Sequence, residues 1–250
     1  MIETVTSRQN SLLTRIARLQ NSKKFRREQG LFVGDGTKLL EEAIRWNPQG
    51  LWAVVLQEGI PCPELPDHVR AVQVPRALME NISQMEAPEG ALFVSAVPEQ
   101  KATEIRRGCL VLDGIQDPGN LGTILRTADA LEIPVVLLDG CADAYNPKTV
   151  RASMGAVFRT QPVSMTRTQA IAGCREQGIP LLATAMSADA VDLRQADLRA
   201  AAVVIGSEGQ GICPELFAAA EQKIIIPMSP RCESLNAAVA ATIVLWQMKR

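Results

Sequence analysis

Three polar loops stand next to long apolar runs, and their side chains are of types that bind and orient a ligand. They are DPGNLGTILR at 117–126, VVIGSEGQG at 203–211 and IIIPMSPRCESLN at 224–236. Amide side chains both donate and accept hydrogen bonds, a guanidinium holds anions or carbonyl oxygens, and a carboxylate attracts positive charge. Such a set suits the binding and orientation of a ligand that carries charge or hydroxyl groups.

Helix caps explain some of these polar residues but not all of them. The Pro-Gly turn in the first loop predicts that Asn120 caps a helix, and Ser234 is expected to cap the last helix of the chain. Asn236 then has no capping role at that helix, so we expect it to face a ligand or to cap a second element. Arg126 falls among apolar residues, where a guanidinium needs either a carboxylate neighbour or an anionic ligand.

The glycine-rich loop that follows Ile205 does not match a nucleotide-binding fingerprint. Its spacing differs from GxGxxG, and no acidic residue is clearly placed about 20 positions later. The segment GDGTKLL at 34–40 lacks a third glycine, and neither segment is a P-loop. Glu208 would repel a phosphate, so the loop fits a ligand that carries positive charge or hydroxyl groups. A nicotinamide cofactor is therefore disfavoured.

The loops lie between apolar runs that are typical of a parallel sheet in an α/β protein. From residue 108 onward the runs are CLVLD, PVVLLD, PLLATAM, AAVVIG and KIIIPM, with helices expected at 120–131 and 166–177. Ligands of such sheets bind at the carboxyl ends of the strands, and each of the three polar loops comes after an apolar run that is expected to form a strand. We therefore expect the loops to converge.

The N-terminal part of the chain predicts a smaller α/β domain over residues 1–97, followed by a polar linker at 98–107. The net charge of the whole chain is −1, but residues 1–30 carry seven basic side chains and only two acidic ones. A basic amphipathic helix is expected at 11–29. Such a charge concentration can hold phosphates, and a solvated helix face is the alternative interpretation.

Composition excludes several other classes of protein. Hydrophobic residues make up 47% and charged residues 21%, which argues against a disordered or fibrous chain. No apolar run reaches the length of a membrane span, so no membrane partner is expected. The six cysteines form no CxxC pair, and the single histidine has no neighbouring ligand. We expect no metal site and a reducing, cytoplasmic location.

Taken together and in this order, the segments resemble the SpoU group of the SPOUT superfamily, which are RNA ribose 2′-O-methyltransferases that use S-adenosylmethionine. The resemblance covers nearly the whole chain. Its three motifs are similar to Asp117-Pro118-Gly119-Asn120-Leu121-Gly122 with Arg126, to Ile205-Gly206-Ser207-Glu208-Gly209, and to Ile226-Pro227-Met228 followed by Ser234-Leu235-Asn236. Residues 148–155 resemble the family's linking helix, and the segment from TSRQNSLL to KLLEEA resembles an L30e-type domain.

The resemblance implies a fold and a set of partners. Residues 1–97 would form an L30e-like α/β RNA-binding domain, and residues 108–250 a SPOUT α/β domain whose parallel sheet carries a C-terminal trefoil knot. It also implies a cytoplasmic homodimer with S-adenosylmethionine bound near the subunit interface. The implied partner is structured RNA, with ribosomal RNA favoured over transfer RNA, and no DNA. The alternatives are methylation of transfer RNA, or a non-enzymatic RNA-binding or assembly protein on the same fold.

The resemblance also assigns roles to individual residues. Five candidates for the methyl-transfer step are Asn120, Arg126, Glu208, Ser234 and Asn236. Four candidates for holding the cofactor are Gly206, Ile226, Met228 and Leu235. Because a guanidinium has a pKa above about 12, a free base form is scarce. We therefore expect Arg126 to hold a phosphate and to polarise the 2′-oxygen.

Overall fold

The structure is a computed structural model that describes residues 2–99 and 104–250. It divides into two compact units, Met1–Glu99 with Tyr145–Arg159, and Gln100–Ala144 with Thr160–Arg250. The expected domain boundaries stay a prediction, and part of the expected linker at 98–107 lies outside the described residues. The units differ from that expectation in one segment, because residues 145–159 pack with the N-terminal residues.

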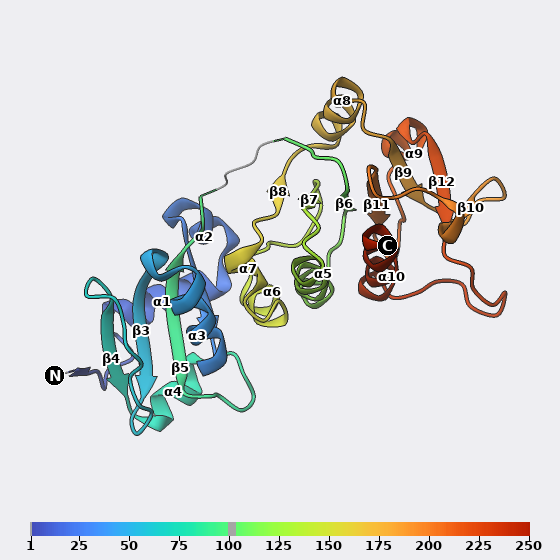
Figure 1. Cartoon of the computed structure of the whole chain (residues 1–250). Coiled ribbons are helices and arrows are strands. Elements are labelled where there is room, and N and C mark those ends of the chain that lie inside the picture. Colours follow the sequence, from blue (N-terminus) through green and yellow to red (C-terminus); the bar gives the residue numbers. More distant parts are fainter. Residues whose placement is uncertain (1, 100–103) are drawn as a thin grey trace. The chain divides into compact units, whose positions relative to one another are not determined.

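The first unit is built on a mixed five-stranded sheet with the strand order β1-β4-β3-β5-β2 (Figure 1). Strands β1 and β3 pair with β4 in parallel, whereas β5 pairs antiparallel with β2 and β3. Its elements are β1 Glu3–Thr4, α1 Ser11–Asn21, α2 Lys23–Gln29, β2 Leu31–Asp35, α3 Thr37–Trp46, the 3₁₀ turn η1 Pro48–Gly50, β3 Leu51–Gln57, β4 Arg70–Val74, α4 Arg76–Ile82, β5 Ala91–Ala96, α6 Pro147–Ala152 and α7 Ala156–Arg159.

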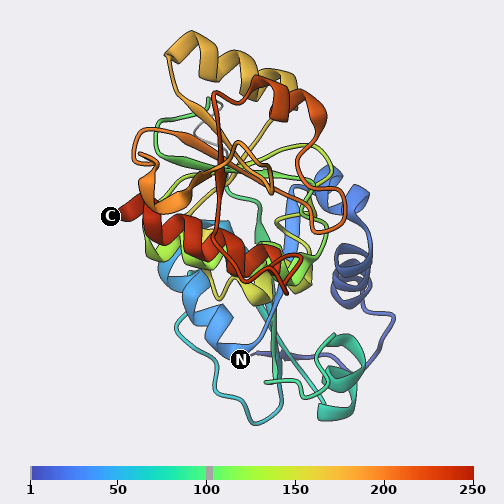
Figure 2. The ribbon, with the colours of Figure 1, turned by 90° about the vertical axis from the view of Figure 1, so that its right-hand side faces the viewer.

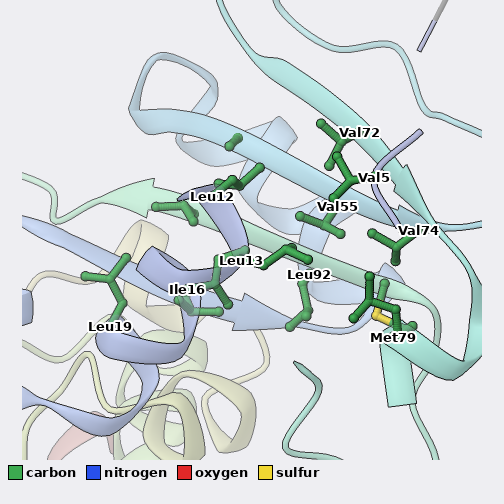
Figure 3. Packing of buried hydrophobic residues seen from close by; sticks show 14 residues of the cluster. Val5, Leu12, Leu13, Ile16, Leu19, Val55, Val72, Val74, Met79 and Leu92 are labelled. Carbon is green, nitrogen blue, oxygen red and sulfur yellow. The ribbon is translucent and has the colours of Figure 1, made fainter. Parts of the chain in front are cut away.

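Helix α1 packs its apolar face on this sheet, as its 3.6-residue pattern predicts. Figure 3 shows Leu12, Leu13, Ile16 and Leu19 of α1 beside strand residues such as Leu92, and all of them are buried. Burying each such side chain contributes roughly 1.5–3 kcal/mol. The basic side chains of α1 are therefore left on the opposite, solvent side of the helix.

The prediction of a single helix at 11–29 is wrong, because the helix is interrupted at Ser22. Ser22 has extended backbone (φ −128°, ψ 108°), and its hydroxyl accepts a hydrogen bond from the Phe25 amide, which starts α2. Arg26 turns back and donates to the carbonyls of Leu19 at 2.6 Å and Gln20 at 3.2 Å. These carbonyls at the end of α1 would otherwise lack partners, so this cation serves the fold.

The segment 145–159 completes the apolar side of the first unit. The rings of Tyr145 and Phe158 lie 5.0 Å and 5.9 Å from the ring of Phe32, and Arg159 forms an ion pair with Glu42.

Asp35, the last residue of β2, is buried and accepts hydrogen bonds from the Ser83 hydroxyl and the Gln84 amide. Burial raises the pKa of the Asp35 carboxyl more than these bonds lower it.

The second unit is a seven-stranded sheet in which every pairing is parallel, so the parallel sheet predicted from the apolar runs is confirmed. The strand order is β10-β12-β9-β11-β6-β7-β8. Its elements are β6 Cys109–Asp113, α5 Pro118–Ala130, β7 Val135–Leu137, β8 Val163–Ser164, α8 Arg167–Gln177, β9 Leu181–Thr184, β10 Val191–Asp192, the 3₁₀ turn η2 Leu193–Gln195, β11 Ala202–Gly206, α9 Pro214–Ala219, β12 Gln222–Ile225 and α10 Ala237–Lys249.

Helices α5 and α10 pack against each other although more than a hundred residues separate them in sequence. Figure 1 shows the two helices side by side, and Figure 2 shows α10 along its length in red. The packing is close because small residues such as Ala128 and Ala241 are fully buried. It brings the start of α5 and the start of α10 to the same edge of the sheet.

None of the helices within residues 2–99 and 104–250 has both the length and the apolar character that crossing a membrane requires.

Candidate active site

A hollow of about 370 Å³ opens at the carboxyl ends of β9, β11 and β12, and we call it the carboxyl-edge hollow. This is where parallel sheets bind ligands. Its lining is mostly apolar, with the Glu208 carboxylate and the hydroxyls of two serines among the few polar groups. The residues that line it are Thr184, Ala185, Met186, Ile205, Gly206, Ser207, Glu208, Gly211, Ile212, Phe217, Ile224, Ile225, Ile226, Met228, Ser234, Leu235, Ala237 and Ala240.

The glycine-rich loop after β11 folds back on itself to form one wall of this hollow. Ser207 and Gly211 exchange backbone hydrogen bonds of 3.0 and 3.1 Å, and the Ser207 hydroxyl accepts a bond from the Gln210 amide. A Cβ at Gly206 would collide with the backbone of Gly211, so the tight loop itself requires glycine there. Gly209, by contrast, has open space around it and an ordinary backbone conformation.

Asp113 anchors the far end of this loop. It ends β6, opposite Gly206 on β11, and only 2% of its surface is exposed. One carboxylate oxygen accepts a hydrogen bond from the Cys213 amide at 2.7 Å, and the other accepts one from Arg167 Nε at 2.8 Å. The bond to Asp113 raises the pKa of the Arg167 guanidinium. Sequence reasoning missed this residue.

The cap of α10 is Asn236, and the prediction that Ser234 caps this helix is wrong. The Asn236 side-chain oxygen accepts bonds from the amides of Ala238 at 2.9 Å and Val239 at 3.3 Å. The last helix starts later than expected because its first two residues, Ala237 and Ala238, are buried. Ser234 instead lines the carboxyl-edge hollow.

The cap of α5 was also predicted wrongly. Asp117 caps this helix by accepting a hydrogen bond from the Asn120 amide at 2.8 Å, so Asn120 lies in the first turn of the helix. Its side chain is thereby released from capping. The helix places the Asn120 side chain next to Glu208, which follows β11, and Asn236, which starts α10.

Glu208, Asn120 and Asn236 form one chain of hydrogen bonds drawn from all three loops. Asn236 Nδ2 donates to Asn120 Oδ1 at 3.1 Å, and Asn120 Nδ2 donates to Glu208 Oε1. Asn236 fixes the donor and acceptor roles along this chain of hydrogen bonds, because its side-chain oxygen caps α10 and its amide nitrogen is left to donate to Asn120. The Glu208 carboxylate is therefore held by a neutral donor and keeps its negative charge available to a ligand.

Arg126 is the candidate that a single chain does not bring into this arrangement. It lies on the exposed face of α5, with its side chain in solvent. Within residues 2–99 and 104–250 it makes no ion pair or side-chain hydrogen bond. The alternative of a neighbouring carboxylate is therefore wrong for the described residues, and the alternative of an anionic ligand stays a prediction.

The structure thus brings together all but one of the nine predicted site residues. Six of them line the carboxyl-edge hollow and two form the amide chain beside it. The six are Gly206, Glu208, Ile226, Met228, Ser234 and Leu235. Residues that were not predicted individually are Asp113 at the end of β6, Thr184 and Met186 at the end of β9, and Phe217 on α9. A polar residue at the end of an apolar run is the sequence signal that marks Asp113 and Thr184.

The hollow fits a ligand that combines a flat apolar part with positive charge. The isoleucines at 205, 212, 224 and 226 offer apolar walls, and the Glu208 carboxylate is the charged group in the lining. Its volume lies within the range of about 300–1,000 Å³ that is usual for small-molecule sites. Adenosine and a sulfonium centre have these two properties.

Comparison with known proteins agrees with this geometry. Residues 108–246 match the SpoU rRNA Methylase family, and residues 10–92 match the MRM3-like substrate binding domain. A Bacillus subtilis relative, 23S rRNA (guanosine(2553)-2′-O)-methyltransferase RlmP, is 29% identical over 92% of this chain and 92% of its own. Human mitochondrial rRNA methyltransferase 3 is 28% identical over 95% of this chain and 72% of its own.

Solved structures of the same type cover both units. The AdoMet-bound rRNA methyltransferase from Sinorhizobium meliloti superimposes with a TM-score of 0.84 at 28% identity, over 99% of this chain and 97% of its own. The family match spans more than half of the 250 residues and contains all nine predicted site residues. The chain therefore belongs to the SpoU rRNA methylase family.

Proposed function

We propose that the protein transfers a methyl group from S-adenosylmethionine to a ribose 2′-hydroxyl of structured RNA, with ribosomal RNA as the substrate. The observation that carries the proposal is the chain of Glu208, Asn120 and Asn236 beside an apolar hollow at the carboxyl edge of a parallel sheet. The printed names of relatives such as RlmP, which refer to rRNA and 2′-O-methylation, support the substrate class.

The residues of the hollow divide the work of binding. Gly206, Ile226, Met228 and Leu235 hold the adenosyl part, and the Glu208 carboxylate attracts the positive charge beside it. When bound, S-adenosylmethionine supplies a methyl group on a positively charged sulfur, which is a good leaving group. The protein therefore has to orient the two reactants and receive one proton from the hydroxyl.

Asn120, Asn236 and Ser234 position the carboxylate and the entering ribose. Arg126 holds a phosphate of the RNA and polarises the 2′-oxygen, as the family resemblance implies. Because one chain leaves Arg126 in solvent, this role requires a second copy or the RNA itself to bring the guanidinium and the ribose together. Exposed apolar residues on α10, with Val239 at 48% and Trp246 at 61%, support a homodimer.

The remaining expectations belong to the same proposal. Residues 1–97 bind RNA, residues 108–250 carry the chemistry, and the C-terminal segment passes through a trefoil knot. The route of the chain supports the knot, since residues 226–236 lead from β12 to α10, which packs on α5 beyond β9 and β11. All six cysteines are free thiols, which supports a cytoplasmic location.

Titration calorimetry with S-adenosylmethionine, followed by methyl transfer to ribosomal RNA, tests the proposal. We expect saturable binding and the appearance of 2′-O-methyl groups, whose positions are then mapped in RNA from cells with and without the protein. Absence of cofactor binding at millimolar concentration would refute the proposal. RNA binding without any methyl transfer would favour the non-enzymatic alternative. Methylation confined to transfer RNA would show that transfer RNA, and not ribosomal RNA, is the substrate.

A further inference from the structure

The first unit contains a second hollow, of about 680 Å³, which we call the N-terminal hollow. It lies beside α1, where side chains of α1 and α2 meet Trp52 of β3 and Arg70 of β4. Three arginines and two aromatic rings lie in its wall. The lining residues are Gln9, Ser11, Leu12, Thr14, Arg15, Arg18, Phe25, Gln29, Trp52 and Arg70.

Two of the three arginines carry charge that no carboxylate neutralises. Arg15 lies with its guanidinium carbon 5.0 Å from the Trp52 ring centre and donates to Gln29, and Arg18 lies 4.0 Å from the Phe25 ring. Neither forms an ion pair within residues 2–99 and 104–250. Only Arg70 is paired, with Glu3 at 3.0 Å, and that pair is largely exposed. The hollow therefore carries net positive charge, which attracts anions.

Trp52 distinguishes this hollow from a simple phosphate site. It lies on β3, where most of its neighbours are buried, yet 38% of its surface is exposed. An indole that faces solvent beside cations offers a flat surface on which a nucleobase stacks, whatever its sequence. The bases of a duplex are stacked on one another and cannot use that surface. The combination therefore favours an unpaired nucleotide over double-stranded RNA.

The alternative is an arrangement without a ligand, in which arginines rest on aromatic rings at the surface. That interpretation does not account for the excess of seven basic over two acidic side chains in residues 1–30 of a chain whose net charge is −1. It also does not account for three guanidinium groups around one hollow. A binding measurement separates the two interpretations.

We propose that the N-terminal hollow binds an unpaired nucleotide of the RNA substrate, with its base on Trp52 and the adjoining phosphates on Arg15, Arg18 and Arg70. The inference rests on the proposed function, because it names the part of the substrate that the first unit holds. The carboxyl-edge hollow takes no part in it.

The test measures binding of a short unpaired oligoribonucleotide of mixed sequence at several salt concentrations. Trp52→Leu is expected to weaken binding about tenfold. The double variant Arg15→Gln with Arg18→Gln is expected to lower the slope of log K against log salt by about 1.4, since each phosphate contact on a single strand contributes about 0.7. Trp46→Leu is the matched control, because Trp46 is also exposed, at 48%, but lies on α3 outside this hollow.

Tryptophan emission provides a second readout. The chain has three tryptophans, so Trp46→Phe with Trp246→Phe leaves Trp52 as the only emitter. The unpaired RNA is expected to quench this emission, and a duplex of the same sequence is expected to leave it nearly unchanged. Equal quenching by both, or no quenching despite binding, would overturn the stacking assignment.

The outcome can be separated from that of the proposed function. If the hollow variants bind RNA as tightly as Trp46→Leu and with the same salt slope, this inference is wrong, while cofactor binding and methyl transfer by the unaltered protein leave the function standing. If the unaltered protein does not bind the RNA, this inference is also wrong, and the calorimetric titration with S-adenosylmethionine then decides the function separately. Thermal unfolding of each variant checks that the fold is retained.

Discussion

Replacing Asp113 by asparagine is expected to loosen the wall of the carboxyl-edge hollow without enlarging any cavity. The carboxylate accepts one hydrogen bond from the Cys213 amide and one from Arg167, at 2.7 and 2.8 Å. An asparagine of the same shape has only one oxygen, so it can keep one of these bonds. Arg167, whose side chain is 32% exposed, loses its bond to Asp113 and keeps the one to the Asp139 carbonyl at 3.2 Å, while the bond from the Cys213 amide is retained.

The magnitude follows from the bond that is lost. A hydrogen bond to a charged group contributes about 1.5–3 kcal/mol, and the partial exposure of Arg167 places the cost of Asp113→Asn near the lower end, at about 1.5 kcal/mol. Asp113→Ala also leaves the half-buried Cys213 amide without an acceptor, which adds about 1–3 kcal/mol. We therefore expect a total of about 2.5–4.5 kcal/mol for the alanine variant.

Urea unfolding measured through Trp246 emission tests this estimate, because Trp246 is the one tryptophan of the second unit. Trp46→Phe with Trp52→Phe provides the background. Calorimetry should also give about tenfold weaker cofactor binding for Asp113→Asn, since the loop must then be ordered when the ligand binds.

The matched control is Asp197→Asn, which removes an exposed ion pair with Arg199 in the same unit and should leave unfolding unchanged. If Asp113→Asn unfolds at the same urea concentration as this control and binds the cofactor equally well, the anchoring role of Asp113 is refuted.

Three further predictions follow from the geometry. Asn236→Asp keeps a good helix cap but cannot donate a hydrogen bond to Asn120, so methyl transfer should fall at least tenfold in an RNA assay. Asn236→Ala should in addition lower the free energy of unfolding in urea by about 1 kcal/mol. Equal transfer by Asn236→Asp and the unaltered protein would contradict the amide chain. Burial raises the pKa of the Asp35 carboxyl above 3.8 in the folded state, so folding favours the protonated acid. This contribution to stability is fully present at low pH and is lost as pH rises through the raised pKa. The unfolding free energy of the unaltered protein minus that of Asp35→Asn should therefore decrease with rising pH, and a flat difference would argue against the raised pKa. Cys232 is exposed and lies in sequence between two stretches that line the carboxyl-edge hollow. Saturating S-adenosylmethionine should therefore slow the reaction of Cys232 with a thiol reagent, and the exposed Cys62 should react at an unchanged rate. Mass spectrometry of labelled peptides measures both rates.

Much of the fold could be predicted from sequence because buried parallel strands need continuous apolar runs. Runs such as CLVLD and AAVVIG correspond to β6 and β11, which lie side by side. The two-residue strands β8 and β10 could not be found in this way, since a pair of residues carries no periodicity. Their pairing is decided by the neighbouring strands.

Helix starts were the least predictable part of the site. Ser234 and Asn236 are both good capping residues only two positions apart, and the outcome depends on which alanines of α10 become buried against other parts of the unit. The anchor Asp113 was missed for a related reason. Its partners Arg167 and Cys213 lie 54 and 100 residues away, and a lone acidic residue at the end of a strand does not reveal them.

Asn236 both starts the last helix and completes the chain of amides, and this double use has a consequence for biosynthesis. A ribosome makes β6 and α5 about a hundred residues before residues 226–240, which supply one side of the hollow. A nascent polypeptide therefore lacks a working centre until nearly the whole second unit has been made. Proteolytic cleavage in this late segment would likewise separate α10 from the rest of the chain and open one side of the hollow, so quality control of the enzyme can act on a short stretch of chain.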